Sequence, residues 1–229
     1  MKWLSPSLLI HAYLTKATGR RIFDGPFKDL FFVKPSHEGS YYQKLLGIYG
    51  KELHPILERF SMGSFEKVLV IGADEGYYAV GLASNWKRPV LAFESNPVGR
   101  DRITRLALIN KTMVFVKGAF DTELDNQSNR DFVLMDLLGA EKDILTSDRF
   151  TVWANCTIIA KVGTEVTKGL VSERAKFTHE VGFVVAQKRS IKDYSFSPPF
   201  KRLLGRWWLQ ILQPEHGDFI GWLTFEPKS

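Results

Sequence analysis

The chain has 229 residues, of which 45% are hydrophobic, and it carries a formal net charge of +6 with a single cysteine. This length and composition predict a globular protein with a substantial core and exclude a disordered chain. One cysteine cannot form an internal disulfide, so a small disulfide-stabilised scaffold is excluded as well. No apolar stretch approaches the roughly 18 residues that a membrane-spanning segment needs.

The positive charge is scattered along the chain, with local clusters only at Lys16–Arg21 and Lys201–Arg206. A protein that follows a nucleic-acid backbone carries a continuous basic patch. We therefore expect no nucleic-acid partner and attribute the charge to solubility. Residues Met1–Leu14 are interrupted by Pro6 and His11 and lack a small-residue cleavage site, so we expect no signal peptide and a cytoplasmic protein.

Residues 1–60 are expected to form an N-terminal extension that covers the site of a main domain at residues 61–229. Pro6–Thr15 predicts a short helix, and Gly19–Asp24 and Leu30–Val33 predict two short strands around a turn.

The second half of this extension has apolar residues at helical spacing from Tyr42 to Phe60. The pattern predicts one amphipathic helix or two, broken near Gly47 or Gly50. Because proline is tolerated only in the first turn of a helix, Pro55 predicts that a helix restarts there.

Residues Lys67–Ala83 have the pattern of a buried strand, a glycine turn and the start of a helix. Val68–Ile71 is an uninterrupted apolar run, which is typical of a parallel strand covered on both faces. Gly72 and Gly76 bracket a tight turn, and Tyr77–Ala83 has helical spacing. A turn without side chains lets a ligand approach the backbone, and a helix N-terminus attracts a carboxylate or phosphate. This is the front half of a nucleotide-binding βαβ unit.

Strands and helices then alternate along the rest of the chain, which favours a parallel sheet with helices on both faces. The last two strands have no helix between them and are expected to form an antiparallel pair at the sheet edge. The polar residues Asp121–Asn129 predict a surface loop, and the long connection Ser190–Asp218 is expected to be functional. The expected strands are Val90–Glu94, Thr112–Lys117, Asp131–Asp136, Cys156–Lys161, Gly182–Lys188 and Gly221–Glu226, and the expected helices are Val98–Asn110, Gly139–Leu145 and Lys168–Glu180.

Glu94 lies 22 positions after Gly72, at the end of the second expected strand. Ligands of open α/β sheets bind beyond the carboxyl ends of the strands, where an acid can accept hydrogen bonds from ribose hydroxyls. This placement is compatible with NAD, but the turn Gly72–Gly76 lacks the G-x-G-x-x-G spacing of a dinucleotide site. The alternative role for Glu94 is a cap on the following helix.

Four stretches in this order have a recognisable pattern: Lys44–Arg59, Val68–Ala83, Ala92–Asn96 and Val133–Glu141. Together they resemble the FkbM-type family of S-adenosylmethionine-dependent methyltransferases, and the resemblance covers most of the chain. It implies a Rossmann-like, seven-stranded methyltransferase sheet that is mostly parallel, with a C-terminal antiparallel strand pair and helices on both faces. It also implies S-adenosylmethionine as the cofactor.

The resemblance implies roles for individual residues as well. Glu94 would hold the ribose, with Ser95 beside it, and Gly118 and Ala119 would flank the adenine. Tyr77 and Tyr78 are placed either against the sulfonium, by a cation–π contact, or in helix packing. The residues that would face the methionine part are Gly72, Ala73, Asp74, Gly76 and Tyr77.

Two residues are the candidates for catalysis. Asp136 ends the fourth strand, where it would face the methionine end or the acceptor. His179 is the candidate base because its unperturbed pKa is about 6.5, and the alternative is a histidine held at a helix end. His216 is a weaker candidate. Cys156 is expected to be a buried small hydrophobe, and no His, Cys or Asp spacing predicts a metal site.

The chain departs from the family pattern at several polar positions. The family has acids where this chain has Val70, Gly50 and Leu138, and Lys161 is the charged residue where the family has an acid and a histidine. The main hypothesis is an O-methyltransferase acting on a small-molecule or glycan-type hydroxyl. The alternatives are a non-catalytic S-adenosylmethionine-binding protein and, from the basic charge alone, an RNA methyltransferase. Pro198–Trp208 predicts a lid, a membrane or RNA contact, or a core helix.

Overall fold

The central sheet of the computed structural model has strand order β3-β2-β1-β4-β5-β7-β6. The structure describes residues 6–32, 40–121, 130–137, 139–189, 193 and 220–228, with side chains from residue 12. Strands β1 to β5 run parallel, and β7 is antiparallel to both β5 and β6. The predicted mostly parallel sheet with a C-terminal antiparallel pair is therefore confirmed. The strands are β1 (Val68–Ile71), β2 (Val90–Phe93), β3 (Val114–Lys117), β4 (Phe132–Met135), β5 (Thr157–Val162), β6 (His179–Val185) and β7 (Gly221–Pro227).

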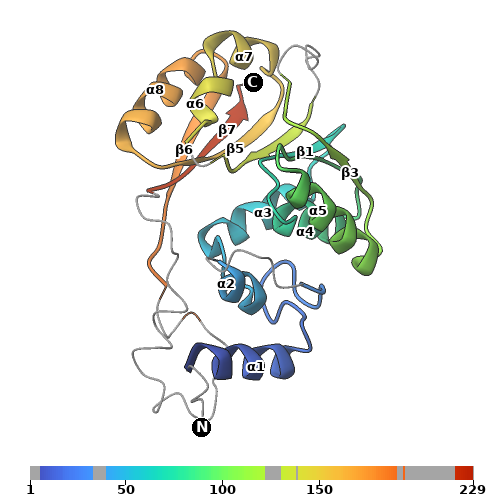
Figure 1. The fold of residues 1–229 in the computed structure, drawn as a ribbon. Helices are drawn as coiled ribbons and strands as arrows, with labels where there is room; N and C mark the ends of the chain where they lie inside the picture. Colours follow the sequence, from blue (N-terminus) through green and yellow to red (C-terminus); the bar gives the residue numbers. More distant parts are fainter. Residues whose placement is uncertain are drawn as a thin grey trace.

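Helices cover both faces of the sheet (Figure 1). Alternate residues of β1 explain why: Val68 and Val70 pack into one apolar core, and Leu69 and Ile71 pack into the other. A strand buried on both faces needs such a continuous apolar run. One face carries α3 (His54–Ser61), α4 (Tyr77–Asn85) and α5 (Pro97–Asn110), and the other carries α6 (Glu141–Ile144), α7 (Ser147–Val152) and α8 (Glu165–Ala175).

The N-terminal elements lie on the α4 side of the sheet, with α1 (Pro6–Thr18) farther from it than α2 (Tyr41–Leu46) (Figure 1). The predicted first helix is confirmed. The two predicted short strands are wrong, because the described part of that segment pairs only through an isolated bridge between Arg21 and Phe31. This pair lies apart from the main sheet, so it has no further strand to extend it.

The predicted break in the helical pattern after α2 occurs at both glycines. Gly47 and Gly50 have positive φ, and a short 3-10 helix, η1 (Lys51–Leu53), separates α2 from α3. A side chain on Gly47 would overlap the backbone of Asp24, so the close approach of these two segments requires glycine.

Two boundaries near the C-terminus differ from prediction. Helix α8 begins at Glu165 because the Thr164 side chain caps it, accepting from the Thr167 N–H, and β6 begins at His179. Within the described residues, no helix is both long and apolar enough to cross a bilayer. Some positions named in the sequence predictions lie outside the described residues. These are Leu138, His216, Pro198–Trp208, most of Asp121–Asn129, and the long connection Ser190–Asp218 except for Asp193.

Candidate active site

The glycine turn after β1 lies against the end of β2. The N–H groups of Gly72 and Ala73 both donate to the carbonyl oxygen of Phe93, at 2.9 and 3.0 Å. Gly72 has φ +77°, and a Cβ there would overlap the carbonyl of Asp136 at the end of β4. Three strand ends therefore meet at one backbone position that only glycine can occupy.

Glu94 lies beside this turn, as the sequence predicts. One carboxylate oxygen accepts from the Asp74 N–H at 2.8 Å, and the other accepts from the Asn96 N–H at 2.7 Å. Glu94 thus joins the glycine turn to the start of α5. The bond from the Asn96 N–H is the kind of contact expected if Glu94 caps the following helix, which was the alternative role. Each oxygen keeps a further lone pair for a ligand hydroxyl. Ser95 and the pair Gly118 and Ala119 follow β2 and β3 at the same edge and are exposed.

Asp136 follows β4 and forms a cluster with two residues that the sequence analysis did not place in the site. The Lys161 ammonium lies 3.0 Å from Asp136 Oδ1, and the Tyr49 hydroxyl donates to Oδ2 at 3.2 Å. The Lys161 and Asp136 side chains are 16% and 13% exposed. Burial, and then the negative charge of Asp136, raise the pKa of Tyr49 well above its usual value. The sequence did contain a signal for Lys161 as a site residue, because it is the one charged residue in the otherwise apolar strand β5.

A second charged pair lies next to the turn. The Lys44 ammonium of α2 donates to Glu75 Oε1 at 2.5 Å and lies 3.4 Å from Asp74 Oδ2. Burial raises the pKa of Glu75 to about 7, although the Lys44 charge acts in the opposite direction. Burial by itself lowers the pKa of Lys44, but the charges of Glu75, Asp74 and Asp136 outweigh it and the net shift is upward.

Tyr77 and Tyr78 begin α4 and pack among aromatic rings. Tyr77 meets Phe27 edge-on with ring centroids 5.2 Å apart, and Tyr49 at 5.4 Å. Both hydroxyls are buried, and within the described part of the chain neither has a hydrogen-bond partner. The Tyr78 hydroxyl lies where a side chain on Gly50 would stand. The close approach of this hydroxyl leaves room only for glycine at position 50.

His179 does not lie at this site, which corrects the prediction that it is a catalytic base. Its Nε2 donates to the Cys156 carbonyl at 3.0 Å, and its ring packs edge-on against Phe150. Burial lowers its pKa. Cys156 precedes β5, whereas Asp136 lies at the carboxyl ends of the strands. Cys156 and Asp136 are therefore separated by the length of β5, which is roughly 15–20 Å at about 3.3 Å per residue.

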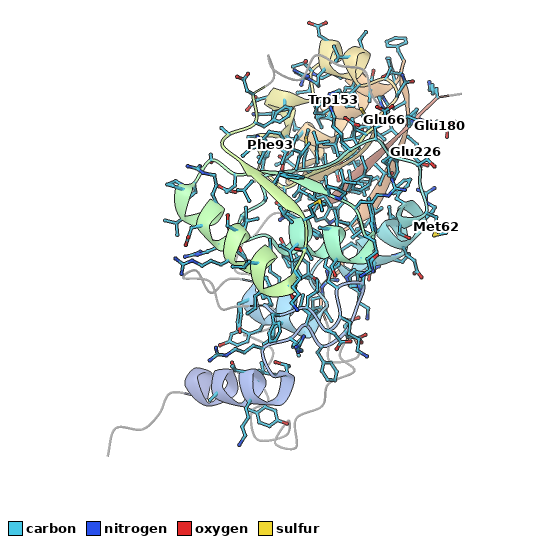
Figure 2. All side chains as sticks on the ribbon, turned by 90° about the vertical axis from the view of Figure 1, so that its right-hand side faces the viewer. Met62, Glu66, Phe93, Trp153, Glu180 and Glu226 are labelled. Atoms are coloured by element: carbon cyan, nitrogen blue, oxygen red, sulfur yellow. The ribbon has the colours of Figure 1, made fainter. Side chains whose placement is uncertain are left out.

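Figure 2 shows this separation of the two sheet edges. Glu180 and Glu226, which are register partners beside His179, lie with Glu66 toward one side of the sheet. Phe93, at the end of β2, lies toward the other side. Cys156 itself is buried, as predicted.

Two buried acids that the sequence analysis gave no role shape the surroundings of the site. Glu141 accepts from the N–H groups of Leu137 and Gly139 at 2.7 and 2.9 Å, so it closes the loop after β4. Glu52 of η1 pairs with Arg189 at 2.5 Å and so connects the N-terminal part to the segment that follows β6. Among the residues described, no group of three His, Cys, Asp or Glu could hold a metal ion.

Comparisons with known proteins identify the fold. No family model and no curated protein matches the chain by sequence. Among solved structures, precorrin-6y C5,15-methyltransferase from Geobacter metallireducens GS-15 is 15% identical with a TM-score of 0.54, over 86% of this chain and 94% of that one. The Pyrococcus abyssi tRNA (uracil-54, C5)-methyltransferase, solved with S-adenosyl-L-homocysteine, is 14% identical with a TM-score of 0.53, over 90% of this chain and 43% of that one. The chain therefore has the Rossmann-like fold of these two methyltransferases.

Proposed function

We propose that this protein is an S-adenosylmethionine-dependent methyltransferase that acts on the hydroxyl of a small molecule or glycan. The observation that carries the proposal is the contact between Glu94 and the glycine turn, where one carboxylate bonds Asp74 and Asn96 at the carboxyl edge of the sheet. The fold shared with two methyltransferases and the FkbM-type sequence pattern support it.

The residues present fit the nucleoside of this cofactor. Glu94 is half-buried beside a turn that tolerates no side chain at Gly72, so backbone and carboxylate face the same edge. Glu94 would hold the ribose hydroxyls, and the exposed backbone at Gly118 and Ala119 would border the adenine. When bound, the cofactor supplies an electrophilic methyl group on a sulfonium.

Asp136 is the group that we assign to the acceptor. Lys161 and Tyr49 contact its carboxylate from two directions and so fix its orientation. An acceptor hydroxyl that hydrogen-bonds Asp136 would be aligned for attack and would lose its proton to this carboxylate. Alignment of bound reactants can lower such a barrier by about 7–11 kcal/mol.

The second candidate is a protein that binds the cofactor without transferring its methyl group. The observation that favours it is the same cluster, because Asp136 is already engaged by Lys161 and Tyr49. His179, the other predicted catalytic residue, is buried at the opposite edge.

Calorimetry with S-adenosylmethionine and with NAD tests the cofactor first. We expect S-adenosylmethionine to bind and NAD not to bind, and the reverse result would rule out the proposal. Incubation with radiolabelled cofactor and a panel of hydroxylated small molecules and glycans then separates the two candidates. Transfer of label to a hydroxyl supports the enzyme, and binding without transfer to any member supports the non-catalytic protein.

A further inference from the structure

Strand β3 forms an edge of the sheet whose backbone is open to a further strand. It is the outermost strand on one side, and in the described part of the chain only β2 pairs with it (Figure 1). The carbonyl oxygens of Met113 and Lys117 accept from N–H groups at the two ends of β2, at 3.0 and 3.2 Å. Because the backbone groups alternate in direction along a strand, those of Val114 and Val116 point outward. An edge of this kind is a template for the addition of a strand.

One face of this edge is apolar and has no helix on it. Val114 and Val116 pack into the core beneath α5, so Phe115 lies on the opposite face, next to its register partner Leu91. On that face α6 and α8 pack on β5, and α8 also packs on β6 and β7, across the sheet from β3. Among the described residues, no helix lies between β3 and β4 in the chain. Phe115 is therefore 53% exposed, and Met113, two residues before it, is 59% exposed.

A groove of about 390 Å³ opens beside Phe115. Its other walls come from the residues that precede β1 and β2 and from β2 itself, and they include Phe65, Pro89 and Leu91. The groove lies at the amino ends of these strands, whereas the candidate active site lies at their carboxyl ends. A mostly apolar groove next to a free strand edge can receive a side chain of an added strand.

Positive charge surrounds this surface. Lys67 and Arg88 line the groove, with Glu66 as the acid in its lining, and Lys111 and Lys117 are exposed before and at the end of β3. A second copy of the chain would bring its own lysines against these, and like charges on paired strands are destabilising. A bilayer receives protruding side chains and leaves a groove unfilled. The charges therefore favour a partner with acidic residues.

We propose that the outer edge of β3 and the groove beside it bind an extended segment of a partner protein. The segment adds to the sheet as a strand, places an apolar side chain in the groove against Phe115, and carries acidic residues that face Lys111 and Lys117. Main-chain hydrogen bonds to β3 supply affinity, and the groove and the charges supply specificity. This docking surface is independent of the proposed methyl transfer.

The experiment selects peptides from a displayed library of random linear sequences on the full-length protein and measures the dissociation constants of the enriched peptides by fluorescence anisotropy. We expect the enriched sequences to combine acidic and apolar residues. Phe115→Thr keeps a strand-forming residue and should weaken their binding about 10-fold or more, because the aromatic wall of the groove is lost. Raising the salt from about 0.05 to 0.5 M should weaken it several-fold, since exposed charges are screened.

The role of the backbone is tested on the wild-type protein alone. An added strand points alternate N–H groups at β3. Two forms of one enriched peptide, methylated on one or the other alternate set of backbone nitrogens, should therefore differ about 10-fold or more in affinity. Equal affinity of the two forms would overturn strand addition. This comparison also decides the matter if Phe115→Thr does not fold.

Phe177→Thr is the matched control, because this phenylalanine is 81% exposed and leads into β6 at the other end of the sheet. It should bind the peptides as the wild type does. Failure to enrich any peptide whose binding depends on Phe115 would overturn the proposal. Dimerisation that Phe115→Thr abolishes, measured by analytical ultracentrifugation, would overturn it in favour of a second copy. Binding to phosphatidylserine vesicles with the same dependence would overturn it in favour of a lipid surface.

Discussion

Lys161, near the end of β5, lies 3.0 Å from Asp136, which follows β4. The neighbouring strands β4 and β5 pair in parallel register, with Met135 opposite Ala160, so the next residues on each strand face each other at the carboxyl edge. The ion pair is therefore a direct product of strand pairing. It also places a lysine ammonium against Asp136, the carboxylate that we assign to the acceptor.

The first prediction concerns this pair. Asp136→Asn should lower methyl transfer by about 10²-fold or more, because the amide cannot take a proton from the acceptor. The cofactor dissociation constant should stay within a few-fold. Single-turnover kinetics with labelled cofactor measures the first quantity, and calorimetry the second. Asp143→Asn, at an exposed position on α6, is the control. Full activity in Asp136→Asn would remove Asp136 from the mechanism.

The second prediction concerns the ribose. Glu94→Gln should weaken S-adenosylmethionine by about 1–3 kcal/mol, since hydrogen bonds to a charged group become bonds to a neutral one. Glu66→Gln is the matched control, because Glu66 is exposed just before β1 at the other edge of the sheet (Figure 2). Calorimetry on both variants measures the difference. An affinity equal to wild type in Glu94→Gln would show that the ribose lies elsewhere.

The third prediction concerns the pH dependence of stability. The pKa of Glu75 is raised by burial from 4.5 to about 7, so the folded state holds this proton more tightly than the unfolded chain does. This contribution is complete below about pH 4.5 and is lost as the pH rises through about 7. Relative to Glu75→Gln, the free energy of unfolding of the wild type should fall by up to about 3 kcal/mol across this range.

Urea unfolding of both proteins at several pH values between about 4.5 and 8 measures this difference. The comparison with Glu75→Gln cancels the carboxylates that titrate elsewhere in both chains. A difference that stays flat over the range would show that Glu75 titrates at its ordinary pKa.

The fourth prediction concerns His179, which we now place in the structural core. His179→Gln should destabilise the fold by about 1–3 kcal/mol, because the Cys156 carbonyl loses a well-placed donor. Turnover per folded molecule should not change. Thermal unfolding and steady-state kinetics on the same preparation measure both. A large loss of kcat with normal stability would restore the catalytic role.

The fifth prediction concerns Gly50 and Tyr78. Gly50→Ala should cost about 1–3 kcal/mol of stability, since φ there is +60° and the new methyl group would overlap the Tyr78 hydroxyl. Tyr78→Phe removes a buried hydroxyl without a described partner, so it should be close to neutral. The double variant should recover part of the loss in a double-mutant cycle by urea unfolding. Strict additivity would argue against the contact.

The sequence by itself determined the sheet and the position of the glycine turn. Val68–Ile71 has apolar residues on both faces, and Gly72 and Gly76 mark the turn, so local pattern predicts a buried parallel strand that leads into a helix. Glu94 could be placed at the turn for the same reason, because adjacent parallel strands end at one edge of the sheet. These features depend on residues close together in the chain or on strand order.

Only the tertiary structure decided which charged side chains meet. Lys44 reaches Glu75 from a helix 31 positions earlier in the chain, and Tyr49 and Lys161 meet at Asp136 from 87 positions before it and 25 positions after it. His179 looked equally suited to catalysis, but β6 begins at that residue and strand direction carries it to the opposite edge. Spacing along the sequence sets neither the residue at which the edge strand β6 begins nor the docking of an N-terminal helix, because both follow from burial of apolar faces in three dimensions.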